Sequence, residues 1–200
     1  MVKQLKEKGI TLKFIDIGGG LGITYKDELP PHPDDYARII EEELKGTELT
    51  LILEPGRVIV GNSGIFVTKL LYIKKVPGKT FYIVDGAMND LVRPSLYGAF
   101  HEIVSVRYND AKKINVDVVG PVCESGDFLA KDRDMPLVES GELLAVLSAG
   151  AYGFSMSSNY NSRRRVAEVL VRDAEFNVIK SRETLKDLIK GEKIPSFMEV

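Results

Sequence analysis

Two loops in the first sixty residues carry groups that suit a ligand with both an anionic and a basic part. Gly18-Gly19-Gly20 directly follows the mostly apolar residues 12–17, and Glu54-Pro55-Gly56-Arg57 directly follows the apolar residues 49–53. Consecutive glycines let the backbone approach a ligand closely and point several N–H groups at a phosphate. A carboxylate beside a phosphate loop suits a basic nitrogen on the same ligand, and pyridoxal phosphate carries both groups.

Other interpretations of these loops stay open on the residues alone. The glycine run lacks the Lys-Ser/Thr of a P-loop and the spacing of a dinucleotide fingerprint, so a flexible strand-to-helix turn is the alternative. A local salt bridge is the alternative for Glu54 and Arg57. The place of both loops at the C-terminal ends of successive parallel strands favours a shared ligand, because ligands of such sheets bind at that edge.

The elements that position the loops alternate between helix and strand. The pattern predicts a helix over residues 2–8, a strand over 12–17, a helix over 33–45 and a strand over 49–53. This order is typical of a βαβ unit with a parallel sheet, and we expect its apolar strands to be buried. One such unit cannot close a barrel or cover both faces of a parallel sheet. We therefore expect a partner chain, or the preceding part of a longer protein, to supply the rest.

From residue 61 onward the pattern changes to strands. The β-branched and aromatic residues 65–76, a turn at Pro77-Gly78-Lys79 and residues 80–84 predict a hairpin. Further strands are expected over residues 103–108, 114–119, 143–147 and 165–171, and a late helix over 181–190 with Ser181 as its N-cap. The sequence thus predicts an α/β unit over residues 1–60 and an all-β domain with a terminal helix over residues 61–200.

Composition excludes several classes of function. The 200 residues include 27 Lys and Arg against 29 Asp and Glu, so the net charge of −2 provides no basic footprint for nucleic acid. The single cysteine excludes an internal disulfide and a Cys-rich zinc site, and we expect no metal. The sequence has no apolar run of about 18 residues and no apolar signal core. We expect a cytoplasmic protein without a membrane partner.

Four motifs, in this order along the chain, resemble those of the fold-type III pyridoxal-phosphate decarboxylases. They are Asp16-Ile17-Gly18-Gly19-Gly20, Glu54-Pro55-Gly56-Arg57, Cys123-Glu124-Ser125 and Gly150-Ala151-Tyr152. The resemblance extends over essentially the whole chain. It implies the C-terminal portion of a TIM (β/α)8 barrel, followed by a β-sandwich or Greek-key β-barrel domain.

Two segments resemble the diaminopimelate decarboxylase branch of this family, which converts meso-2,6-diaminopimelate to L-lysine and CO2. Residues 88–97 resemble its substrate-binding segment, and residues 123–127 resemble its catalytic cysteine segment. Diaminopimelate carries a carboxylate and an ammonium at its far end. Arg93 and Arg57 suit that carboxylate, because a planar guanidinium binds carboxylates in bidentate fashion, and Glu124 suits the ammonium.

The resemblance also implies a role for each matching residue. Gly18, Gly19 and Gly20 would hold the cofactor phosphate, supported by the Gly56-Arg57 backbone, and Glu54 would face the pyridine nitrogen. The substrate-binding residues would be Arg57, Arg93, Tyr97, Glu124 and Tyr152, with Tyr152 also on the phosphate. Cys123 would donate a proton after CO2 leaves, and with Glu124 it would reach the site of the neighbouring subunit in a homodimer.

Simpler interpretations of these residues also stand. Cys123 can be a small buried hydrophobic residue, Tyr152 a packing aromatic, and Arg93 and Tyr97 surface residues of a helical turn. His32 and His101 receive no role.

The family's Schiff-base lysine and ring-stacking histidine lie on the first half of the barrel, which this chain lacks. We therefore expect the C-terminal half of an enzyme, inactive by itself. The alternatives are a decarboxylase of the ornithine, arginine or carboxynorspermidine type and a non-catalytic dimerising relative.

Overall fold

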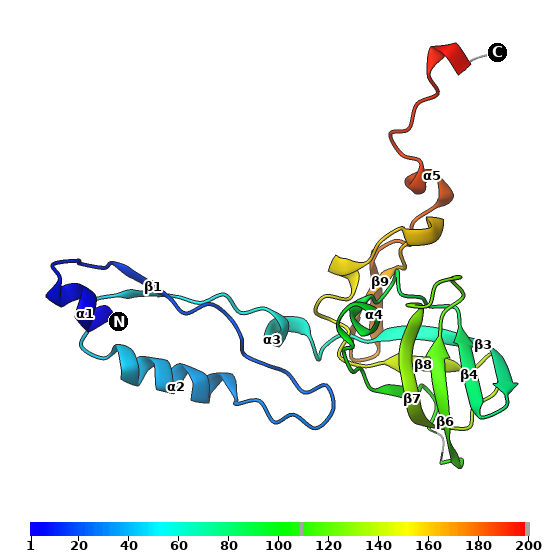
Figure 1. The fold of residues 1–200 in the computed structure, drawn as a ribbon, viewed down its shortest axis with the longest axis horizontal. Helices are drawn as coiled ribbons and strands as arrows, with labels where there is room; N and C mark the ends of the chain where they lie inside the picture. The colour runs from blue at the N-terminus through cyan, green and yellow to red at the C-terminus, as the bar shows by residue number, and fades with distance from the viewer. Residues whose placement is uncertain (109, 199–200) are drawn as a thin grey trace.

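The computed structural model describes residues 1–108 and 110–198, and its N-terminal arm extends away from a sheet domain (Figure 1). The elements of the arm are α1 (Val2–Glu7), β1 (Phe14–Asp16), α2 (Pro33–Leu44), β2 (Thr50–Ile52) and α3 (Arg57–Val60). Strands β1 and β2 are parallel, with Phe14 opposite Thr50 and Asp16 opposite Ile52. The predicted βαβ order is therefore present.

Helix α2 begins where the sequence provides a cap and a fixed backbone angle. The His32 side chain accepts a hydrogen bond from the backbone N–H of Asp34, and Pro33 occupies the first turn. Asp34 and Asp35 lie at the positive end of the helix dipole.

The expectation that both strands of the arm are buried is wrong for this chain. Phe14 is 59% exposed and Ile52 is 41% exposed. A two-stranded sheet with one crossover helix has too few elements to cover its own faces, so the apolar side chains remain open to solvent.

The sheet domain is built on one six-stranded mixed sheet, in the order β5-β8-β3-β4-β6-β7. Its strands are β3 (Phe66–Val76), β4 (Lys79–Val84), β5 (Ile103–Ser105), β6 (Lys113–Val119), β7 (Phe128–Pro136) and β8 (Leu143–Val146). The predicted β3–β4 hairpin is confirmed, with Val76 opposite Lys79. Strands β4 and β6 pair in parallel, and the other neighbours are antiparallel.

The core of the molecule lies in this domain. Its buried cluster includes Leu70, Tyr82, Val84, Leu91, Val116, Val118, Leu129, Met135, Leu144 and Val146. The Tyr82 hydroxyl lies 3.2 Å from the carbonyl oxygen of Pro136, so the largest buried side chain has a partner for its polar end. The short helix α4 (Arg93–Tyr97) packs beside β7.

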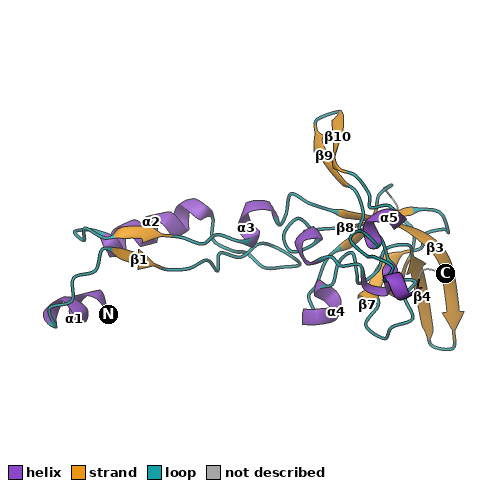
Figure 2. Cartoon of the chain, turned by 90° about the horizontal axis from the view of Figure 1, so that it is seen from above, coloured by secondary structure: helices purple, strands orange, loops and turns teal. Residues whose placement is uncertain are grey.

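The C-terminal part leaves the sheet domain in steps. The 3₁₀ turns η1 (Phe154–Met156) and η2 (Tyr160–Ser162) lead into β9 (Glu168–Arg172) and β10 (Glu175–Lys180). These two strands form a hairpin that projects from the domain (Figure 2). Beyond it come α5 (Leu185–Leu188) and η3 (Ser196–Met198).

The predicted helix over residues 181–190 is shorter than expected. Thr184, and not Ser181, is its N-cap, because Thr184 and Asp187 form a reciprocal capping box. Glu183, the residue before this cap, forms an ion pair with Arg165, because its carboxylate lies 3.0 Å from the Arg165 guanidinium.

Candidate active site

The two predicted ligand loops lie against each other at the C-terminal ends of β1 and β2. The backbone N–H of Glu54 donates to the Gly18 carbonyl oxygen at 2.8 Å, which continues the parallel pairing beyond the strands. A side chain at position 19 would collide with the Glu54 carbonyl oxygen. Glycine at position 19 therefore permits the close approach of the two loops.

The glycine loop leaves open space beside its backbone. Gly18 and Gly20 have φ values of +72° and +94°, which side chains rarely tolerate. A Cβ at either position would meet no atom within 4 Å. The Asp16 carboxylate fixes the start of the loop by accepting a hydrogen bond from the Gly18 N–H at 2.7 Å. The loop is thus held in place while one side remains accessible to a ligand.

Tyr152 comes to the same place from the other end of the chain. A Cβ built on Gly56 would lie 2.7 Å from the Tyr152 hydroxyl oxygen. The loop that carries Tyr152 is anchored by hydrogen bonds from Ala149 N–H to the Gly64 carbonyl and from Gly150 N–H to the Gly61 carbonyl. The glycine loop, the Glu54 loop and Tyr152 therefore form one group, whose side chains are exposed.

The two predicted carboxylate-binding arginines both lie close to one aromatic ring. The guanidinium carbons of Arg57 and Arg93 lie 5.9 and 4.8 Å from the ring centroid of Tyr25. Arg93 is only 6% exposed, so its alternative interpretation as a surface residue is wrong. Tyr97, one helical turn later in α4, is 64% exposed.

Cys123 and Glu124 lie on an exposed turn between β6 and β7, so Cys123 is not a buried hydrophobic residue. The buried Asp127 carboxylate fixes this turn by accepting hydrogen bonds from the N–H of Val122 at 2.6 Å and of Met88 at 2.7 Å. A Cβ at Gly126 would lie 2.6 Å from the Ser95 hydroxyl oxygen. These contacts place the turn against α4 and not against the glycine loop.

Tyr160, in the 3₁₀ turn η2, contacts the Cys123 turn through its side chain. Its hydroxyl donates to the Glu124 carboxylate at 3.3 Å, and the charge of Glu124, together with this hydrogen bond, raises the pKa of the Tyr160 phenol. Tyr160 therefore stays neutral and remains a donor. Arg163 holds the Tyr160 segment by donating to the Asn89 side-chain oxygen at 2.8 Å.

The sequence-family model for the C-terminal sheet domain of the pyridoxal-dependent decarboxylases matches residues 15–150, which are more than half of the chain. The chain belongs to the pyridoxal-dependent decarboxylases. The matched region includes the glycine loop, the Glu54 loop and the Cys123 turn.

The chain is similar to several named relatives and solved structures in this decarboxylase family. Diaminopimelate decarboxylase of Pseudomonas aeruginosa is 54% identical over 194 residues, which is 97% of this chain and 46% of that protein. A diaminopimelate decarboxylase structure from M. jannaschii superposes with a TM-score of 0.90 at 39% identity, covering 99% of this chain and 47% of the other. The Helicobacter pylori enzyme, solved with L-lysine, gives a TM-score of 0.84 at 46% identity, covering 94% and 46%. The chain spans about half the length of the relatives it matches.

The decarboxylase residues around the glycine loop fit pyridoxal phosphate. The open space beside Gly18 and Gly20 leaves room for an anion at the loop, and the Tyr152 hydroxyl lies beside Gly56. Glu54 is exposed on the neighbouring loop and supplies the carboxylate that a pyridine nitrogen requires.

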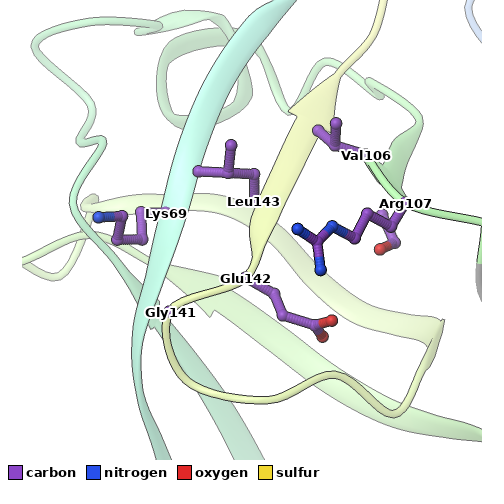
Figure 3. A pocket seen from close by; sticks show the side chains of 7 residues that line it. Lys69, Val106, Arg107, Gly141, Glu142 and Leu143 are labelled. Carbon is purple, nitrogen blue, oxygen red and sulfur yellow. The ribbon is translucent and has the colours of Figure 1, made fainter.

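A separate hollow of about 350 Å³ on the sheet domain is lined by Lys69, Ser105, Val106, Arg107, Gly141, Glu142 and Leu143 (Figure 3). It contains none of the predicted site residues. Within residues 1–108 and 110–198, no helix is long and apolar enough to cross a membrane.

Sequence reasoning missed Tyr25, Asp127, Tyr160 and the part played by His101. Each acts through a contact distant in sequence, such as the Tyr25–His101 ring contact. Among these, only Asp127 carries a local signal, because it ends the Cys123-Glu124-Ser125-Gly126-Asp127 motif.

Proposed function

We propose that this chain forms the C-terminal half of a pyridoxal-phosphate decarboxylase that converts meso-2,6-diaminopimelate to L-lysine and CO2. The observation that carries the proposal is the pair of guanidinium groups, Arg57 and Arg93, that both lie within 6 Å of the Tyr25 ring centroid. Diaminopimelate has a distal carboxylate for them to bind, whereas the amino acids that give simple diamines have only a distal ammonium. Arginines at that place would repel such an ammonium.

The proposal assigns residues 1–60 to the last units of a TIM barrel and residues 61–200 to the β-domain, a sandwich or Greek-key barrel. The parallel β1–β2 pair and its exposed apolar side chains support the first assignment, because barrel strands are parallel and covered by helices. The six-stranded sheet supports the second.

Pyridoxal phosphate, when bound, supplies the electron sink that accepts the electrons left by departing CO2. The loop of Gly18, Gly19 and Gly20 would hold its phosphate, with the N–H groups of Gly19 and Gly20 as donors because the Gly18 N–H donates to Asp16. Tyr152 and the Gly56-Arg57 backbone would lie beside them. The Glu54 carboxylate holds a proton on the pyridine nitrogen. The lysine that binds the aldehyde of the cofactor is not among the motif residues that this chain shares with the family.

Two residues of the Cys123 turn complete the proposed chemistry from the neighbouring subunit of a homodimer. The Cys123 thiol donates a proton to the carbon from which CO2 has left. Glu124, oriented by the Tyr160 hydroxyl, binds the distal ammonium of the substrate. The exposure of Cys123 and Glu124 supports a role across subunits.

The test needs a complete enzyme, which we define as this chain joined at Met1 to the preceding part of the Pseudomonas aeruginosa relative. With pyridoxal phosphate, it should release CO2 and L-lysine from meso-2,6-diaminopimelate and prefer it over ornithine, arginine and carboxynorspermidine. The 200-residue chain alone should give no lysine above background.

Two outcomes would contradict the proposal. Preference for a substrate without a distal carboxylate would remove the role given to Arg57 and Arg93. A folded, cofactor-bound complete enzyme without any decarboxylase activity would favour a non-catalytic relative.

A further inference from the structure

His101 is a fully buried side chain that joins a proposed substrate-binding residue to the backbone of the Tyr152 loop. Its Nε2 lies 3.0 Å from Nη1 of Arg93, and its Nδ1 lies 2.9 Å from the carbonyl oxygen of Leu147. Arginine has only donors, so Nε2 must accept from Arg93. Nδ1 must then carry the proton and donate to Leu147. The two hydrogen bonds therefore fix one neutral form of the ring.

The Arg93 guanidinium is held on a second side by Tyr25. It lies 4.8 Å from the Tyr25 ring centroid, and the edge of that ring meets His101 at an interplanar angle of 81°. The Tyr25 hydroxyl oxygen is buried and has no hydrogen-bond partner among the described residues. The aromatic ring, and not its hydroxyl, therefore makes the contact with Arg93.

The rest of the guanidinium remains available to a ligand. Nη1 of Arg93 is used by His101, and within the described part of the chain the structure shows no protein acceptor for the other N–H groups. Among the described residues only the Tyr25 hydroxyl is both buried and unpaired, so the free Arg93 nitrogens are accessible, and a carboxylate can accept two of their N–H groups.

The His101 ring also connects Arg93, on the proposed substrate side of the site, to the loop that carries Tyr152, on the proposed cofactor side. Leu147, which accepts from His101, lies at the start of the loop that ends in Tyr152. Ser148 of that loop lies 2.7 Å from the Asn62 side chain. These hydrogen bonds hold Arg93 in position relative to Tyr152, whose hydroxyl lies beside Gly56.

We propose that His101 is a positioning residue that sets the orientation in which Arg93 binds the distal carboxylate of the substrate. The inference rests on the proposed function, because that function supplies the carboxylate. His101 itself does not touch the substrate.

The test compares two substitutions in the complete enzyme. His101→Asn places an amide near the Nδ1 position, so it keeps a donor for Leu147 and loses the acceptor for Arg93. His101→Gln reaches the Nε2 position and can retain that acceptor. His32→Asn is the matched control, because His32 is the exposed N-cap of α2 and asparagine caps equally well.

We expect His101→Asn to raise KM for diaminopimelate by about ten-fold or more, the effect of losing a hydrogen bond to a charged group, with kcat changed by less than about three-fold. His101→Gln should recover most of the loss, and His32→Asn should match the wild type. Inhibition constants provide a second measurement. L-Lysine retains the distal carboxylate of the substrate, because CO2 leaves from the other end, so it should bind more weakly to His101→Asn. Cadaverine, which has the distal ammonium and no carboxylate, should bind as before.

The outcomes separate the two proposals. If the wild-type complete enzyme does not act on diaminopimelate, the proposed function fails. If it does, and His101→Asn weakens L-lysine and cadaverine equally or weakens neither, His101 does not position Arg93.

Discussion

At the scale of single residues, the charge of His101 depends on its surroundings. Burial holds the pKa of His101 below its ordinary value; the hydrogen bond to Leu147 opposes this shift, and the charges of Arg93 and Arg133 add to it. The unfolded chain takes up the proton near pH 6.5, whereas the folded chain takes it up only at lower pH. The stabilisation from neutral His101 is therefore present above about pH 6.5 and is lost as the pH falls through the lowered pKa.

A difference measurement isolates this contribution. Between pH 7 and pH 5, the free energy of unfolding of the wild-type chain should fall more than that of His101→Asn, by up to about 1.4 kcal/mol for each unit of the pKa shift. Urea denaturation at both pH values measures it. A pH difference in His101→Asn equal to that of the wild type would show that the ring is not held neutral.

At the scale of elements, Asp127 connects two segments that are far apart in the sequence. Its carboxylate accepts one N–H from the turn after β6 and one from the segment before α4. Asparagine at this position would present an N–H₂ group to one of the two donors. We expect Asp127→Asn to lower the free energy of unfolding by about 1–3 kcal/mol.

The same substitution should lower kcat in the complete enzyme, because it releases the turn that carries Cys123. Urea denaturation of the chain and steady-state kinetics of the complete enzyme measure the two effects. Asp173→Asn is the control, since Asp173 lies in the exposed β9–β10 turn at φ +53°, which asparagine adopts readily. Equal stability of Asp127→Asn and the control would contradict the role of Asp127.

The elements that the sequence predicted well are those with a local signal. Alternating apolar residues and the Pro77-Gly78 turn predicted the β3–β4 hairpin, and the helix-strand order predicted the parallel β1–β2 pair. Strand β7 was missed because Lys131, Asp132, Arg133 and Asp134 interrupt its apolar pattern at an edge of the sheet. Strand β10 was missed although Phe176, Val178 and Ile179 lie in it, because no buried face sets an alternating pattern.

The contacts of the site also differ in whether a local sequence pattern could predict them. The meeting of the glycine and Glu54 loops follows from parallel strands, so the sequence could predict it. The contacts of Tyr25 with Arg93 and His101 join segments about seventy residues apart, and a single tyrosine or histidine has no spacing to indicate them.

At the scale of the whole molecule, the exposed apolar residues of the arm determine how the isolated chain behaves in solution. Phe14 and Ile52 are exposed on neighbouring strands, and Ile59 and Val60 are exposed in α3. Exposed apolar side chains of this kind promote association.

Sedimentation velocity tests this expectation on the isolated chain. The wild-type chain should show mass that increases with concentration, and the double variant Phe14→Ser, Ile52→Ser should show less association. Tyr72→Ser, which removes an aromatic residue 66% exposed on the sheet domain, is the control and should associate like the wild type. A wild-type chain that stays monomeric at all concentrations would show that the arm does not drive association.

The contacts of residues 23–25 define which part of the chain can be exchanged between related genes. The Thr24 carbonyl accepts from Asn62 at 2.9 Å and from Ser148 at 3.2 Å, and a Cβ at Gly61 would collide with Ile23. Recombination at residue 61 would separate these residues from the partners they fit. A crossover before residue 21 would keep them together. The unit that keeps these contacts together therefore begins about forty residues upstream of the sheet domain, inside the segment that the strand pattern alone assigns to the α/β unit.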